Sequence, residues 1–463
     1  MIPPSGGSAG RRIRHFDTRL DEIMLTIGLD IGTSSVKGAL VSVTDGGHEV
    51  SATATEAVSY HVSRVAPGTP GYTGYGAGDL YGSVCAVIRR LIESADENVA
   101  AAAIASASGN TVLAGENGEP LCDAFSWTSP PVPEEYGRYF GDIDEDEVYA
   151  RCGWPISAAF PPGHLALVAA HAPELIASAA KVTMTTEYIL KRLTGEWMTD
   201  RSTATPSYLC DQRSGKWMPE MYERVGVKGS QLPRVGETGD IVGTLTPEAA
   251  AETGLTASCR AVLGSFDHPS AARGNGIVRQ GQLLLSCGTS WVVFVPVDDR
   301  GTVIKERLLC DPFLTGKGGE GPWGAMFSLE SAAVKINHIV EKYISSAPDR
   351  FARLDALSLA ADREAHGLKI DVTKDLPDLS YKDPSDIARA LMLGVSDLLK
   401  ARLDALDRTA GLRFSSAAMA GGPSSSPVWR QTLGEVLGIE VTAAAGAYSG
   451  AVGAALTAAK GLS

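Results

Sequence analysis

Two aspartates stand at the ends of apolar segments, where a carboxylate can serve as a metal-associated group or as a general base. Asp30 lies near the end of the first apolar segment, two residues before Gly32, and suits a Mg²⁺-associated role. Asp267 follows an apolar run that ends at Gly264, and we expect its side chain in a turn that faces a cleft, as a general base requires. His268 beside it is a candidate substrate contact, although a lone histidine next to a turn is more often structural.

A Gly-Thr-Ser turn occurs twice, each time between two β-rich segments. Residues 26–43 read TIGLDIGTSSVKGALVSV, and residues 282–297 read QLLLSCGTSWVVFVPV. Such a turn exposes consecutive backbone N–H groups and hydroxyls, which suit phosphate oxygens. Two facing copies could clamp a nucleoside triphosphate, whereas the plainer interpretation is a pair of edge hairpins with a solvated Asp and Lys. The candidate phosphate contacts are Gly32, Thr33, Ser34, Ser35 and the cation Lys37 from the first copy, and Gly288, Thr289 and Ser290 from the second.

A third cluster, MAGGPSSSPVWRQ at residues 419–431, combines a glycine pair with a helix start. Gly421 and Gly422 allow a backbone to approach a flat ring closely, and Ser426 stands at the expected beginning of the helix. From spacing alone, an adenine site and a simple tight turn are both plausible.

The charge balance limits the partners. Of the 463 residues, 54 are acidic and 41 basic, so the net charge of −13 disfavours nucleic acid and anionic membranes. A polyanion must therefore be held locally by N–H groups, a metal or one placed cation. Seven cysteines without CxxC spacing predict reduced thiols and a cytoplasmic location. The uncharged stretch 441–459 is rich in Ala and Gly, which favours a buried strand end and a packed small-residue helix over a membrane span.

Alternating apolar strands and amphipathic helices predict an α/β fold. Residues 164–193 look mostly helical, and 246–254 predict a short helix with Thr246 as its N-cap and Gly254 just past its end. The repeated Gly-Thr-Ser unit suggests two lobes built on one plan. We expect three parts: a disordered N-terminal tail (1–23), an N-terminal domain (24–258) with the first Gly-Thr-Ser motif, and a C-terminal domain (259–463) with the second Gly-Thr-Ser motif and the glycine pair.

Five collinear motifs over roughly 400 residues resemble the FGGY carbohydrate kinases of the actin–hexokinase ATPase superfamily, the family of xylulokinase, gluconokinase and glycerol kinase. The matching stretches are LTIGLDIGTSSVKGAL (25–40), YILKRLTGEWMTDRSTA (188–204), LPRVGETGDIVGTLTPEAAAETGL (232–255) with Asp267, the Cys287–Ser290 turn, and AGGPSSSPVWRQ (420–431).

The resemblance implies two ribonuclease-H-like lobes of the actin-like ATPase type, with ATP and a small sugar or polyol in the cleft between them. It implies Asp267 as the base that deprotonates the sugar hydroxyl, Asp30 as the residue that holds Mg²⁺, and the two Gly-Thr-Ser turns as phosphate contacts. Gly421 and Gly422 would line the adenosine site, and a homodimer is common in the family.

The departures from the family concern the sugar. The family's W-x-D-x-R pattern reads Trp127-Thr128-Ser129-Pro130-Pro131 here, so the usual Asp and Arg are missing. Asn110 and Trp127 are the candidate sugar contacts, the Trp as a platform for an apolar sugar face, with a plain core Trp equally plausible. The lead hypothesis is an ATP- and Mg²⁺-dependent sugar kinase. The alternatives are a catalytically weak, sugar-binding regulatory relative and an actin- or chaperone-like ATPase.

Overall fold

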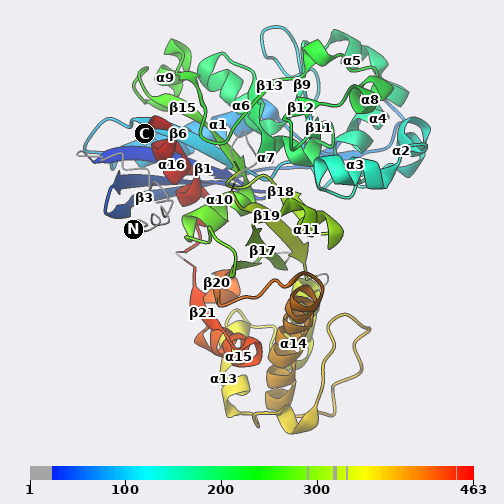
Figure 1. Ribbon diagram of the computed structural model, residues 1–463, viewed down its shortest axis with the longest axis vertical. Helices are drawn as coiled ribbons and strands as arrows, with labels where there is room; N and C mark the ends of the chain where they lie inside the picture. Colours follow the sequence, from blue (N-terminus) through cyan, green and yellow to red (C-terminus); the bar gives the residue numbers. More distant parts are fainter. Residues whose placement is uncertain (1–22, 289–290, 316–320, 330–331, 445) are drawn as a thin grey trace, which may run out of the picture.

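The computed structural model describes residues 23–288, 291–315, 321–329, 332–444 and 446–463. Within these residues the chain forms an α/β structure with two six-stranded sheets. The first sheet lies in the upper part of Figure 1 and the second in the lower part, with a group of helices below it. The α/β architecture predicted from the sequence is confirmed.

The first sheet has the strand order β14-β15-β6-β1-β2-β3. β1 and β2 form an antiparallel hairpin, while β6 and β15 run parallel to β1. Residues of β1 are buried on both of its faces, as expected for a strand in the middle of a covered sheet. The strands are β1 (Met24–Ile31), β2 (Ser35–Thr44), β3 (Gly47–Ala57), β6 (Ala101–Ser106), β14 (Ile241–Thr244) and β15 (Arg260–Phe266).

The second sheet repeats this plan, with the order β18-β19-β17-β16-β20-β21. The hairpin of β16 and β17 corresponds to that of β1 and β2, and β20 and β21 run parallel to β16 as β6 and β15 do to β1. The predicted duplication is therefore confirmed in the order and direction of five strands, whereas the sixth differs: β14 lies beside β15 in the first sheet and β18 beside β19 in the second. The strands are β16 (Gln282–Cys287), β17 (Trp291–Val297), β18 (Leu309–Asp311), β19 (Trp323–Ser328), β20 (Ser416–Gly421) and β21 (Glu440–Ala443).

Helices cover both faces of the first sheet. Helix α1 (Ala77–Ile92) packs its apolar side chains against Ile27, Leu29 and Ile31 of β1. The opposite face is covered by α16 (Ser449–Leu462), whose alanines pack on alanines of β6. Figure 1 shows this last helix, in red, lying on the blue sheet although it ends the chain. Because α16 consists mainly of Ala and Gly, its backbone can approach the sheet closely.

The C-terminal stretch corrects one expectation. The small-residue helix is packed tightly, as predicted. The strand before it, β21, is an edge strand whose residues are exposed or half-buried rather than buried. Edge strands have a neighbour on only one side, so an apolar composition alone does not ensure burial.

The passage between the sheets comes later than the predicted boundary at 258/259. β15 belongs to the first sheet, and α10 (Asp267–Gly274) packs against α16 on the same sheet. The chain enters the second sheet at β16 and returns to the first at α16. The turn signal at Gly254 ends a helix, as predicted, with Thr246 capping α9 (Pro247–Thr253), but it does not mark a change of sheet.

A group of short elements lies beside the first sheet, on the right of Figure 1. The stretch 164–193 is mostly helical but is interrupted by the buried strand β9, which pairs with β7. The helices are α2 (Pro133–Phe140), α3 (Glu145–Cys152), α4 (Pro161–His171), α5 (Pro173–Ser178), α6 (Thr185–Thr194), α7 (Arg201–Ala204) and α8 (Pro219–Tyr222). The strands are β4 (His61–Ser63), β5 (Tyr72–Tyr75), β7 (Val112–Ala114), β8 (Ala124–Phe125), β9 (Lys181–Thr183), β10 (Met198–Asp200), β11 (Cys210–Asp211), β12 (Lys216–Trp217) and β13 (Arg234–Gly236).

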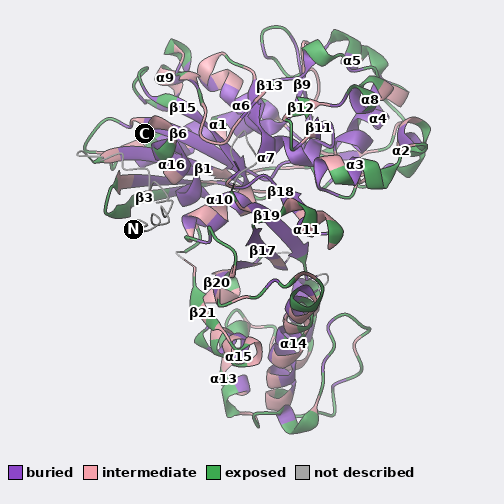
Figure 2. Cartoon of the chain, viewed as in Figure 1, coloured by how far each residue is buried: buried purple, intermediate pink, exposed green. Residues whose placement is uncertain are grey.

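The lower lobe is completed by helices that leave much of their outer surface exposed, as the green ribbon in Figure 2 shows. Its helices are α11 (Arg300–Lys305), α12 (Ala332–Ile339), α13 (Arg350–Ala360), α14 (Pro384–Ala410) and α15 (Pro427–Leu437). Short 3₁₀ or π turns are η1 (Thr205–Ser207), η2 (Glu223–Val225), η3 (Gly229–Gln231), η4 (Val340–Ile344), η5 (Ala365–Gly367) and η6 (Gly422–Ser425).

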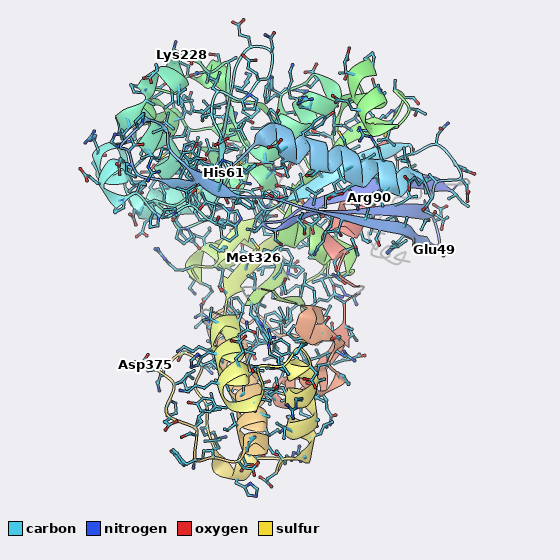
Figure 3. All side chains as sticks on the ribbon, turned by 180° about the vertical axis from the view of Figure 1, so that it is seen from behind. Glu49, His61, Arg90, Lys228, Met326 and Asp375 are labelled. Atoms are coloured by element: carbon cyan, nitrogen blue, oxygen red, sulfur yellow. The ribbon has the colours of Figure 1, made fainter. Side chains whose placement is uncertain are left out.

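The two lobes share a core and a buried polar network. Met326 of β19 lies where they meet (Figure 3), in one apolar cluster with Leu165 and Phe266 of the upper lobe. The Ser202 hydroxyl donates to the Asp311 carboxylate at 2.6 Å, and the Arg273 guanidinium donates to the Phe313 carbonyl at 2.5 Å. These contacts hold Ser202 of α7 and the end of α10 against β18 and the residues that follow it.

Within the described parts of the chain, no helix is long and apolar enough to cross a membrane.

Candidate active site

The register of the first sheet brings Asp30 and Asp267 to the same edge. β1, β6 and β15 are parallel, with Ile31 opposite Ser106 and Ser106 opposite Phe266. The carboxyl ends of these strands therefore lie in one row, which is where open α/β sheets place their ligand sites. β15 continues past Gly264 to Phe266, so Asp267 is the first residue of α10 rather than part of a turn, a correction to the sequence-based expectation.

The two carboxylates influence each other's charge. The pKa of Asp30 is raised to about 7, mainly by burial and also by the nearby Asp267 carboxylate, against a lowering by Lys37. Burial also raises the pKa of Asp267, against a lowering by His268. The His268 backbone N–H donates to the Asp267 carboxylate at 2.7 Å and so fixes its direction. Two neighbouring, partly buried like charges favour either protonation or a cation between them.

Residues behind Asp30 hold it against the last helix. A Cβ atom on Gly450 of α16 would lie 2.5 Å from Oδ2 of Asp30, so only glycine leaves room for the carboxylate there. The Ser270 hydroxyl of α10 donates to the Gly450 carbonyl at 2.8 Å. Gly450 of α16 therefore contacts both β1, which carries Asp30, and α10, which carries Asp267.

Asp30 could hold a Mg²⁺ ion that takes its other ligands from water and substrate. The described residues contain no group of three or more His, Cys, Asp or Glu side chains that could hold a metal. Mg²⁺ keeps several waters and binds through one or two carboxylates together with substrate phosphates, so the single half-buried carboxylate of Asp30 is sufficient from the protein's side.

The first Gly-Thr-Ser turn is tight and ends in two hydroxyl residues. The Gly32 N–H closes it by donating to the Ser35 carbonyl at 3.0 Å, so this N–H is used within the turn. Thr33 and Ser34 form its tip, and Ser34 is exposed. Ser35 is the first residue of β2 and is half-buried. The donors that the turn can offer to a phosphate therefore come mainly from Thr33 and Ser34.

Lys37 is opposite Asp30 in the hairpin of β1 and β2. Its ammonium donates to the Ala447 carbonyl at 3.2 Å. The predicted cation therefore lies near the Asp30 carboxylate but is directed toward the start of α16. A role as a phosphate contact stays a prediction.

The candidate sugar residues lie on the neighbouring loop. Gly109 and Asn110 follow β6, and Asn110 is only 7% exposed. Its amide nitrogen donates to the Ala107 carbonyl at 2.9 Å, and its oxygen accepts from the Trp127 N–H at 3.0 Å. Both ends of the Asn110 amide are thus engaged within the chain, where they hold the Trp127 backbone. Direct contact of Asn110 with a sugar stays a prediction.

Trp127 is not a core residue, because it is 37% exposed. Its indole N–H donates to the Thr33 hydroxyl at 3.2 Å. A row of aromatic rings continues from it through Phe160, Trp154 and Phe266 to His268, with successive centroids 5.4 to 6.4 Å apart. His268 is half-buried at the end of this row. The side of the site next to Asp267 is therefore rich in ring surface.

The second lobe repeats this arrangement. Gly288 follows β16 and is exposed, whereas Thr289 and Ser290 lie outside the described residues. Gly421 is the last residue of the neighbouring strand β20, paired with Cys287 of β16, whereas in the first lobe Gly109 lies just past the end of β6. At Gly421 φ is +89°, and a Cβ atom would lie 2.2 Å from the Cys287 carbonyl oxygen. The second phosphate turn and the glycine pair are thus adjacent strand ends.

A cavity of about 330 Å³ opens beside the glycine pair. Its size lies at the lower end of the range for ligand pockets. Gly422 and Ser426, both predicted, line it, and Gly421 lies next to it. Ser426 caps α15 by accepting from the Trp429 N–H at 3.0 Å. Other lining residues are Ile336, Phe351, Asp355 and Trp429.

The sequence did not indicate Ile336, Phe351 or Asp355. They come from α12 and α13, which carry no motif and reach the cavity only through folding. Trp429 was within the quoted cluster 419–431 but was not singled out. Asp355 stands between apolar residues of α13, which is a weak signal in the sequence, and only the packing of the helices shows that it lines a cavity.

Comparisons with known proteins give the family. Residues 25–274 match the N-terminal domain of the FGGY family of carbohydrate kinases, and residues 358–462 match its C-terminal domain. Curated relatives include an autoinducer-2 kinase from Enterobacter sp. (strain 638), 24% identical over 471 residues, with 94% of this chain and 86% of the relative covered. Another, from Photorhabdus laumondii, is 25% identical over 464 residues, with the same coverage of each.

Solved structures agree. A xylulose kinase from Rhodospirillum rubrum has a TM-score of 0.81 and 25% identity, covering 94% of this chain and 90% of that one. A gluconate kinase from Lactobacillus acidophilus has a TM-score of 0.80 at 18% identity, covering 95% and 90%, which supports the fold. A purely sugar-binding regulator is not favoured, since these relatives are kinases. The chain belongs to the FGGY family of carbohydrate kinases and catalyses the ATP-dependent phosphorylation of a carbohydrate.

Proposed function

We propose that Asp267 is the general base that takes the proton from a hydroxyl of a small ketose, sugar or polyol while the γ-phosphate of ATP is transferred to that oxygen. The observation that carries this proposal is the place of Asp267. It begins α10 at the carboxyl edge of the first sheet, half-exposed, beside Asp30 and with its carboxylate fixed by the His268 N–H. A positioned base of this kind contributes about 10²–10⁴-fold to a rate.

The phosphates of ATP would lie between the ends of the two hairpins. Thr33 and Ser34 offer donors from the first lobe, and Gly288, which follows β16 and is exposed, would contribute from the second. Phosphoryl transfer depends mainly on positioning and charge neutralisation, which fixed N–H and O–H dipoles supply without a basic surface. Asp30 would hold Mg²⁺, which would supply the remaining positive charge near the phosphate oxygens. Gly450 leaves the room that the Asp30 carboxylate needs there.

The nucleoside would occupy the cavity next to Gly422. The cavity adjoins the strand end of β20, which is the neighbour of the strand that carries the second phosphate turn. Its walls are largely apolar, with the Trp429 and Phe351 rings and the Ile336 side chain, as a purine requires. This arrangement supports an orientation of bound ATP in which the base lies in the cavity and the phosphates extend toward Asp30 and Asp267.

The acceptor would lie between Trp127 and Asp267. The missing Asp and Arg after Trp127 leave few charged groups there, whereas the partly exposed rings of Trp127, Phe160 and His268 offer surface for apolar sugar faces. We therefore propose an acceptor with fewer hydroxyls than a common pentulose or polyol. The relatives named for autoinducer-2, xylulose and gluconate define the first compounds to test.

The test is ADP release measured with ATP, Mg²⁺ and a panel of acceptors: ketoses, deoxyketoses, polyols, aldonates and autoinducer-2. The proposal predicts that one class stimulates ADP release strongly above the rate without acceptor. Acceptor binding without turnover for every compound would contradict it, and turnover that responds to polypeptide but not to sugar would indicate a chaperone-like ATPase. The homodimer expected from the family is part of the same proposal, and the mass of the protein in solution tests it.

A further inference from the structure

The cavity beside Gly422 contains one charged side chain. Among the residues that line it, Asp355 of α13 is the only acid or base. Asp355 is half-buried, and burial raises the pKa of its carboxyl, against a lowering by a hydrogen bond from the Ser426 hydroxyl. A half-buried carboxylate is costly unless it has a partner, and the other polar side chains that line this cavity are those of Ser425 and Ser426. Ser426 supplies one donor, and a carboxylate has room for more than one.

Ser426 already has a structural task that leaves its proton available. Its oxygen accepts from the Trp429 N–H and so caps α15. The hydroxyl proton can then be donated to one oxygen of the Asp355 carboxylate. The remaining acceptor positions of the carboxylate are available to whatever occupies the cavity.

We propose that Asp355 determines the nucleobase preference of this kinase by accepting a hydrogen bond from the exocyclic amino group of adenine. This inference rests on the proposed seat of the nucleoside in the cavity. Adenine presents an N6 amino donor on the edge where inosine and guanine present the O6 acceptor. A carboxylate has only acceptors, so it pairs with the amine and repels the oxygen. Asp355 is then a specificity-determining residue that does not touch the reacting atoms.

The competing explanation is that Asp355 is a structural partner of Ser426 and nothing more. In that case its removal loosens the joint between α13 and α15 and weakens every nucleotide alike. The two roles therefore differ in the ratio between nucleotides, not in the affinity for one of them.

The experiment is calorimetric binding of ADP, inosine diphosphate and purine riboside diphosphate to the full chain without acceptor. Purine riboside lacks the 6-amino group and carries no oxygen in its place. A hydrogen bond to a charged group predicts that the wild type binds ADP about 10- to 100-fold more tightly than either analogue. In Asp355→Ala the three dissociation constants should converge to within about 3-fold, through weaker ADP binding.

A conservative variant sharpens the test. Asp355→Asn keeps an acceptor oxygen and gains an amide donor, so it should bind inosine diphosphate more tightly than the wild type does while ADP binding falls only modestly. Asp349→Ala is the matched control, since Asp349 is an exposed aspartate at the start of the same helix whose side chain makes no capping bond. Its three affinities should equal those of the wild type.

Two results would overturn the proposal: equal affinity of the wild type for all three diphosphates, or an unchanged ratio between them in Asp355→Ala. If Asp355→Ala does not fold, Asp355→Asn, which has nearly the same shape, decides the question. Because binding is measured without acceptor, a failure of the proposed base chemistry would leave these ratios intact and would appear only as absent sugar-stimulated turnover.

Discussion

The indole N–H of Trp127 donates a hydrogen bond of 3.2 Å to the hydroxyl of Thr33. Trp127 belongs to the loop proposed to contact the acceptor, and Thr33 belongs to the turn proposed to contact phosphate. The backbone N–H of Trp127 donates to the Asn110 amide oxygen. The Trp127 side chain thus connects the proposed acceptor site with the proposed phosphate site on the first lobe, and it is exposed enough to contact a ligand.

Substitution of Trp127 should separate these two tasks. Trp127→Phe keeps a ring and removes the N–H donor, whereas Trp127→Ala removes both. We expect Trp127→Ala to raise the KM for the acceptor by about 10-fold, and Trp127→Phe by less, because a ring face packs on the apolar side of the sugar. Steady-state kinetics with varied acceptor and saturating ATP measure this. Trp197→Ala, at a half-buried Trp outside the site, is the control; an unchanged acceptor KM in Trp127→Ala would show that the ring does not contact the acceptor.

Enlargement of Gly450 should disturb Asp30 without removing it. In Gly450→Ala the new methyl would lie 2.5 Å from Asp30 Oδ2, so the carboxylate must turn away. We expect at least about a 10-fold higher Mg²⁺ concentration for half-maximal activity, since misplacing a group by about 1 Å can cost up to 10²-fold. Gly82→Ala in α1 is the matched control, because a Cβ there meets no atom within 4 Å. A Mg²⁺ dependence equal to that of the control would contradict the role assigned to Asp30.

The buried Asp200 should make stability depend on pH. Burial raises its pKa from 3.8 to about 7, so the folded chain holds a proton that the unfolded chain releases near pH 4. The contribution of the protonated Asp200 to the free energy of unfolding is fully present below about pH 4 and is lost as the pH rises through 7. Asp200→Asn replaces the protonated carboxyl by an amide that can still cap α7 through the Thr203 N–H. The melting temperature of the wild type should therefore fall more between pH 5 and pH 8 than that of the variant, and parallel curves would contradict the shift.

The sequence predicted local features well, because their causes are local. The hairpins of β1–β2 and β16–β17, the α9 helix with Thr246 and Gly254, and the strand–glycine–helix pattern around Gly421 are each specified by residues a few positions apart. The repeat of the Gly-Thr-Ser unit also identified the duplicated sheet plan, since both copies carry the same pattern.

Contacts between distant segments were not predictable in the same way. The return of α16 to the first sheet depends on the close fit of small residues about 350 positions from β6. The lining of the nucleoside cavity by Phe351 and Asp355 depends on how α13 packs beside α15. Likewise, the amide of Asn110 looked available for a sugar in the sequence, but the fold engages it with Ala107 and Trp127.

The central claim is that Asp267 is the base, and one comparison tests it most directly. Acceptor-stimulated ADP release is measured for the wild type and for Asp267→Asn, together with the affinity of each for ADP. The claim predicts a turnover at least about 10²-fold lower in Asp267→Asn, with ADP affinity changed little, because the amide cannot take the proton but keeps the shape of the carboxylate. Wild-type turnover in Asp267→Asn would contradict the assignment.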